Sequence, residues 1–123
     1  MAKVGMEDAS SGLFPKPTDA QPPHYHGHRD RLRERFLSAG AEKLPDYEVL
    51  ELLLFGVIPR KDTKPIAKAL LAKFGGFDEV LAANPEALMQ VDGIKESAAA
   101  MLKAVLQARI RAQHLALLSD KKQ

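Results

Sequence analysis

The sequence contains no cysteine among its 123 residues. This absence excludes disulfide bonds, thiolate metal ligands and thiol nucleophiles, and it fits a reducing compartment. Long apolar runs are missing too: no stretch approaches the ~20 residues that span a membrane, and the N-terminus lacks the apolar core of a signal peptide. We therefore expect a soluble cytoplasmic protein with no membrane contact.

Strand patterns are also lacking, because no segment alternates apolar and polar residues between turn signals. The hydrophobic content of 46% in a chain of this length is enough for one compact domain but not for two. We expect an all-α fold, a small bundle of about five helices. The composition of residues 1–27, rich in Pro, Ser, Gly and Asp, predicts a disordered leader before a folded domain at 28–118 and a tail at 119–123.

Apolar spacing and end signals place the helices. Leu32 and Phe36 lie one turn apart before Gly40, and "LPDYEVLELLLFGVI" predicts the most buried helix. A third helix starts at Asp62 or Thr63 and ends at Gly75-Gly76. Two short helices and a long alanine-rich helix, "KESAAAMLKAVLQARIRAQHLALL", follow. We assign the carboxylates of the helical part to first turns or exposed faces: Glu48, Glu51, Glu79 and Glu86.

The tight connection "VDGIK" before the long helix is the first candidate site. Gly93 permits a sharp corner, and Val91 and Ile94 serve as apolar plugs on either side. The backbone amides of Gly93, Ile94 and Lys95 lie where a helix N-terminus attracts a phosphate. Apolar-x-Gly-apolar before a helix is typical of a helix-hairpin-helix, which contacts the DNA backbone with little sequence preference.

Two interpretations of this corner remain open. Lys95 adds a positive charge, whereas the neighbouring Asp92 and Glu96 oppose an anion. The alternative to a phosphate site is a corner that only packs.

The basic connection "PRKDTK" is a second candidate. Arg60, Lys61 and Lys64 precede or open a predicted helix, whose N-terminus would share an anion with them. The alternative is a charged surface that only confers solubility. The net charge of +2 is compatible with a nucleic-acid partner but does not require one.

The ordered motifs "RERFLSAGAEKLPDYEVLELLL", "RKDTKPIAKALLAKFGG" and "VDGIKESAAAMLKA" together resemble the N-terminal helical domain of the RadC family (UPF0758-type) over about 80 residues. The resemblance implies helix-hairpin-helix-like corners, as in domain 2 of RuvA, although Lys95 occupies the second glycine position of the family's hairpin. It also implies a link to DNA repair, which is the family's traditional label. In that family a metal-dependent JAB/MPN domain usually follows. This sequence stops before such a domain, so it is either a truncated piece or a stand-alone relative.

Other polar clusters favour structural explanations. His24, His26 and His28 of "HYHGH" would share one side of an extended chain, yet they lack the carboxylate or Cys partners of a closed metal site. The arginines of "HRDRLRER" are interleaved with Asp30 and Glu34, as on a solvated, partly ion-paired helix, and the alternative is a phosphate-facing surface. No Ser-His-Asp or Cys-His set is indicated, and His114 stands alone on the last helix. We expect no catalytic residues, no metal and no cofactor.

Two functions from different classes follow. The first is a non-catalytic, sequence-independent DNA-binding module that uses Gly93, Ile94 and Lys95 with Arg60, Lys61 and Lys64. The second is a protein-interaction or scaffold domain for a partner or for a separated JAB/MPN domain, because the end "AQHLALL" carries more leucine than an exposed helix needs. The partner surface would be Leu115, Leu117 and Leu118.

Overall fold

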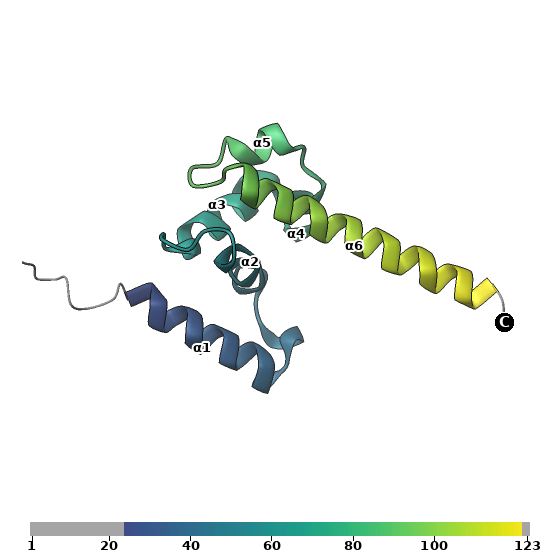
Figure 1. Cartoon of the computed structure of the whole chain (residues 1–123), viewed down its shortest axis with the longest axis horizontal. Coiled ribbons are helices and arrows are strands. Elements are labelled where there is room, and N and C mark those ends of the chain that lie inside the picture. Colours follow the sequence, from purple (N-terminus) through teal and green to yellow (C-terminus); the bar gives the residue numbers. More distant parts are fainter. Residues whose placement is uncertain (1–23, 122–123) are drawn as a thin grey trace, which may run out of the picture. The chain divides into compact units, whose positions relative to one another are not determined.

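The computed structural model describes the backbone of residues 24–121, and over this range every regular element is a helix (Figure 1). This confirms the predicted all-α class. The elements in chain order are α1 (His24–Ala39), the 3-10 helix η3 (Ala41–Lys43), α2 (Asp46–Phe55), α3 (Thr63–Phe74), α4 (Phe77–Ala82), α5 (Pro85–Met89) and α6 (Glu96–Lys121).

Helix α1 begins at His24, four residues before the predicted start of the folded domain. Prolines precede it at positions 22 and 23, and a helix commonly begins directly after proline. The "HYHGH" segment therefore lies in a helix and not in the extended chain that the sequence suggested. Residues 1–23, most of the predicted leader, lie outside the described residues. The chain divides after Arg31 into two compact units, and the following account concerns the second.

An ion pair connects the end of α1 to the start of α2. The Arg35 guanidinium donates to both carboxylate oxygens of Glu48, at 3.1 and 2.8 Å, and this hydrogen bonding raises the pKa of Arg35. Arg33 adds a second link, with its guanidinium carbon 5.2 Å from the centre of the Phe55 ring. Glu48 lies in the first turn of α2, as predicted, and it is buried there because the Arg35 pair covers its carboxylate.

Helices α2 and α3 pack against each other around a second buried carboxylate. Glu51 is fully buried, and it accepts a hydrogen bond of 3.1 Å from the hydroxyl of Thr63, which is itself 1% exposed. The prediction that Glu51 lies in a first turn or on an exposed face is therefore wrong, because it lies beyond the first turn of α2 and is buried. A carboxylate is tolerated inside a protein only where donors replace its water, and the first residue of α3 supplies one.

The predicted helix ends are found. The Asp62 side chain accepts from the Lys64 amide at 3.1 Å and caps α3. The N–H of Gly75, in the left-handed region, donates to the Leu71 carbonyl and closes the same helix. Asn84 caps α5 through the Ala87 amide at 2.8 Å.

Helices α4 and α5 pack on the first half of α6, and with α2 and α3 they enclose the core. The most deeply buried side chains include Leu50, Leu54, Leu70, Leu88 and Leu102. The Lys103 ammonium group of α6 donates to the Leu81 and Ala83 carbonyls, both at 2.8 Å. It thereby bonds carbonyls that the end of α4 leaves without intrahelical partners.

Arg109 of α6 forms an exposed ion pair with Asp78 of α4, and beyond it the helix extends past α4 (Figure 1). Every residue from 107 to 120 is exposed. None of the helices in the described part of the chain is both long and apolar enough to cross a membrane.

Gly93 brings the α5–α6 connection against α3. Its φ is +94°, a region that costs other residues steric energy, and a β-carbon there would lie 2.7 Å from Ile66 Cδ1. Ile66 is buried in the core and has little room to shift. Two independent constraints therefore require glycine at this position.

We expect Gly93→Ala to destabilise the domain by at least ~1 kcal/mol more than Gly75→Ala, as measured by urea unfolding. Gly75 is the matched control: its φ is +102°, but nothing lies within 4 Å of a β-carbon there, so its variant carries only the backbone cost of about 1 kcal/mol. Adding Ile66→Val, which removes Cδ1, should recover part of the difference. Equal losses for the two glycine variants would contradict the close approach.

We expect Thr63→Val to lower the free energy of unfolding by about 1–2 kcal/mol, because buried Glu51 loses a donor while the shape is kept. Thr63→Ser retains the hydroxyl and serves as the control that should lose less. The same urea titration measures both. A stable Thr63→Val protein would show that this hydrogen bond does not support the buried carboxylate.

Candidate nucleic-acid interface

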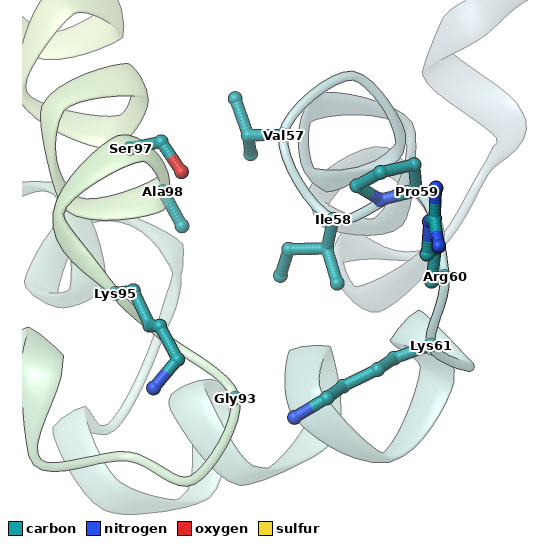
Figure 2. A pocket seen from close by; sticks show the side chains of 9 residues that line it. All are labelled: Val57, Ile58, Pro59, Arg60, Lys61, Gly93, Lys95, Ser97 and Ala98. Carbon is teal, nitrogen blue, oxygen red and sulfur yellow. The ribbon is translucent and has the colours of Figure 1, made fainter.

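A pocket of about 210 Å³ lies between the α2–α3 connection and the start of α6 (Figure 2). It joins the two candidate sites, whose lysines, Lys61 and Lys95, lie 34 positions apart in the sequence. Its lining consists of Val57, Ile58, Pro59, Arg60, Lys61, Gly93, Lys95, Ser97 and Ala98.

Local hydrogen bonding fixes both walls. After α2 the amides of Val57 and Ile58 both donate to the Leu54 carbonyl, at 3.0 and 2.8 Å, which turns the chain back toward α3. On the opposite side the Ile94 amide donates to the Val91 carbonyl at 3.0 Å, which closes the corner before α6. Each wall is therefore a short ordered connection between helices and not a long loop.

Positive charge gathers at one end of the pocket. Lys61 and Lys95 come from opposite walls, and the Lys61 ammonium group extends toward Gly93 (Figure 2). The first turn of α6 lies beside them, and its earliest amides have no carbonyl one turn before them to bond. Together with the helix dipole, this arrangement favours an anion.

The predicted amide donors require a correction. Ile94 has a 3% exposed side chain in the core, and its N–H is already bonded to Val91. Ile94 therefore packs, and its amide is not open to an anion, whereas the first-turn amides of α6 lie next to the predicted Gly93 and Lys95.

The predicted basic residues do not all meet in the pocket. Lys61 and Arg60 line it, but the Arg60 side chain runs beside Pro59 and away from Lys95 in the view of Figure 2. The Lys64 ammonium group lies 6.0 Å from the centre of the Tyr47 ring, and that of Lys68 lies 4.8 Å from it. The Lys64 side chain therefore lies against Tyr47 of α2 and does not line the pocket.

Acidic neighbours lower the local positive charge. The Asp62 carboxylate is engaged as the cap of α3. Asp92 and Glu96 are exposed to solvent, which weakens their repulsion of an anion. Asp92 lines a second, neighbouring pocket with Lys61 and Gly93, outside the lining of the first.

The sequence analysis missed Ser97 and the apolar wall. The Ser97 hydroxyl points into the space between the walls, opposite Val57 and Ile58 (Figure 2). A small polar residue in the first turn of a helix after a glycine corner was the available signal for Ser97. No sequence signal paired Val57 with Ser97, since only the packing of α2 against α6 brings them together.

The predicted leucine surface is exposed but does not form one face. Leu115, Leu117 and Leu118 are 65%, 61% and 42% exposed. Because helix residues follow at about 100° intervals, Leu115 lies about 200° around the axis from Leu117. Leu117 instead aligns with Ile110, one heptad earlier and 46% exposed, which the sequence analysis did not select.

Among the side chains that the structure describes, which exclude His24 and His26, no group of three or more His, Asp or Glu is arranged to hold a metal ion. The groups that line the pocket are two ammonium groups, a guanidinium group, a hydroxyl and an apolar wall, beside the first-turn amides of α6. Such a set favours an anion with an apolar neighbour.

Comparison with known proteins gives consistent results. The UPF0758 N-terminal family matches residues 26–100. A UPF0758 protein of Ruegeria pomeroyi is 52% identical over 87 residues, which cover 71% of this chain and 38% of that protein. A UPF0758 protein of Rhodobacter capsulatus is 54% identical over 80 residues, 65% of this chain and 37% of that protein. The chain thus spans less than two fifths of the length of these relatives. No solved structure matches it.

The matched family region contains both walls of the pocket and the first turn of α6. The match also agrees with the motifs that indicated a UPF0758-type domain in the sequence. The chain belongs to the UPF0758 family and carries its N-terminal domain.

Proposed function

We propose that this domain is a non-catalytic module that binds the DNA backbone without sequence preference. One observation carries the proposal: a single pocket brings together Lys61, Lys95 and the N-terminal turn of α6. Two cations and a helix N-terminus suit a phosphate group better than a neutral ligand.

The size of the pocket favours part of a larger partner. Pockets that enclose a whole small molecule usually measure about 300–1,000 Å³, and this one measures about 210 Å³. A phosphate and its attached sugar on a nucleic-acid strand fit a pocket of this smaller volume, because the rest of the strand lies outside it. Ammonium groups and helix amides contact phosphate without reading bases, so the binding is sequence-independent.

The α5–α6 corner supports a helix-hairpin-helix interpretation. A positive-φ glycine stands between two helices, with the apolar Val91 and Ile94 buried on either side. Lys95, at the position where the family's hairpin has its second glycine, then offers an ammonium contact in place of close backbone approach. By this proposal the domain serves the longer UPF0758 proteins as a DNA-contacting part, consistent with the traditional link to DNA repair.

The direct test is fluorescence anisotropy with duplex, single-stranded and branched DNA at several salt concentrations. We expect an affinity that falls steeply with salt, and we expect Lys61→Gln and Lys95→Gln each to lower the log–log slope by about 1, since each removes one phosphate contact. Lys73→Gln is the matched control, because Lys73 is an exposed lysine at the far end of α3.

The variants leave Gly93 in place, since a β-carbon there would lie 2.7 Å from Ile66 Cδ1 and would destabilise the domain. Circular dichroism confirms that each variant is folded. A folded wild-type chain that binds none of the three DNA forms at low salt would contradict the proposal. Slopes that change equally for Lys73→Gln and Lys95→Gln would contradict the assignment to this pocket.

A second candidate function is protein interaction through the end of α6. Its support is the exposed apolar line of Ile110 and Leu117, which continues the core-facing side of the helix beyond the domain. An exposed apolar line of this kind suits contact with a partner helix or another domain.

Hydrogen exchange tests this second function. In dilute solution we expect the amides of residues 107–120 to exchange faster than those of 98–106, because only the latter lie on packed helix. Protection of 107–120 that rises with protein concentration, disappears in Ile110→Gln/Leu117→Gln and persists in Leu115→Gln would support association through this line. Fast exchange at every concentration would exclude self-association.

A further inference from the structure

We infer that the pocket selects DNA over RNA because its apolar wall takes a deoxyribose ring next to the bound phosphate. The inference rests on the proposed function and adds a specificity to the same site.

The two sides of the pocket differ in chemistry. Arg60, Lys61, Lys95 and Ser97 bring its polar side-chain groups, whereas the consecutive residues Val57, Ile58 and Pro59 supply apolar side chains from one connection (Figure 2). Ile58 is 7% exposed and belongs to the core, so the wall is anchored. A phosphate held by the lysines therefore has apolar surface directly beside it.

The wall also lacks backbone N–H donors. Pro59 has none, and the amides of Val57 and Ile58 both donate to the Leu54 carbonyl. A hydroxyl oxygen pressed against this wall finds no amide N–H to accept from, and burying a polar oxygen without a donor is less favourable than burying a CH₂ group.

The sugar is the group that follows a phosphate along either nucleic acid. Deoxyribose presents a CH₂ at its 2′ position, which suits an apolar wall, whereas ribose presents a hydroxyl there. The 2′-hydroxyl is the feature by which proteins distinguish RNA from DNA at a given contact. The Ser97 hydroxyl, on the α6 side of the pocket, is the one neutral side-chain group that a 2′-hydroxyl would find.

The test measures anisotropy with oligo-deoxyuridine and oligo-uridine of equal length, and with DNA and RNA duplexes of one sequence, at a fixed salt concentration. Where the single-stranded or the duplex DNA binds, we expect it to bind about tenfold tighter than the RNA of the same form. Val57→Thr, which places a hydroxyl in the wall at constant volume, should reduce this ratio to about threefold or less. Val105→Thr is the matched control, because Val105 is half-buried on α6 outside the pocket.

The outcomes separate the two proposals. Equal affinity for DNA and RNA, or a ratio that Val57→Thr leaves unchanged, would overturn the sugar selection and leave the phosphate site standing. Tighter RNA binding that is lost in Ser97→Ala would overturn it in favour of hydroxyl recognition by Ser97. No binding to either nucleic acid would overturn both proposals, and the pocket would then suit an apolar side chain of an acidic peptide.

Discussion

The contact of Gly93 with Ile66 is the constraint on which the rest of the domain depends. At this point the backbone of the α5–α6 connection approaches α3 so closely that no β-carbon fits, and the positive φ of Gly93 turns the chain into α6. Burial of Val91 and Ile94 on either side holds the turn in place. The same contact decides where the first turn of α6 lies, and hence which residues face the α2–α3 connection.

Buried carboxylates show how the two helical pairs are specified. Glu48 is buried against the α1 residue Arg35, and Glu51 is buried against Thr63 of α3. Each pair links α2 to a neighbouring helix by directional bonds that an apolar contact would not impose. The α2–α3 connection, which forms one wall of the pocket, therefore starts and ends in fixed helices.

Much of the fold followed from local signals. The Asp62 cap, the Gly75 terminator and the Asn84-Pro85 start all act within one helical turn, so the sequence placed them correctly. The burial of Glu48 and Glu51 was missed, because a glutamate in the first turns of a helix looks the same whether or not a distant donor covers it. Part of the candidate site could be predicted because Lys61 and Lys95 lie beside turns that local residues define. The apolar wall opposite Ser97 has no local sequence signal, so it could not be predicted.

The sequence by itself determined the all-α class, the helix ends, the glycine corner and the family, since each depends on residues close together in the chain or on ordered motifs. Only the tertiary structure decided that Lys61 and Lys95 share one pocket, that Lys64 turns to Tyr47, and that Leu117 aligns with Ile110 and not with Leu115. The physical reason is that direction around a helix and distance between connections are set by packing of α2, α3 and α6, which no short stretch of sequence contains.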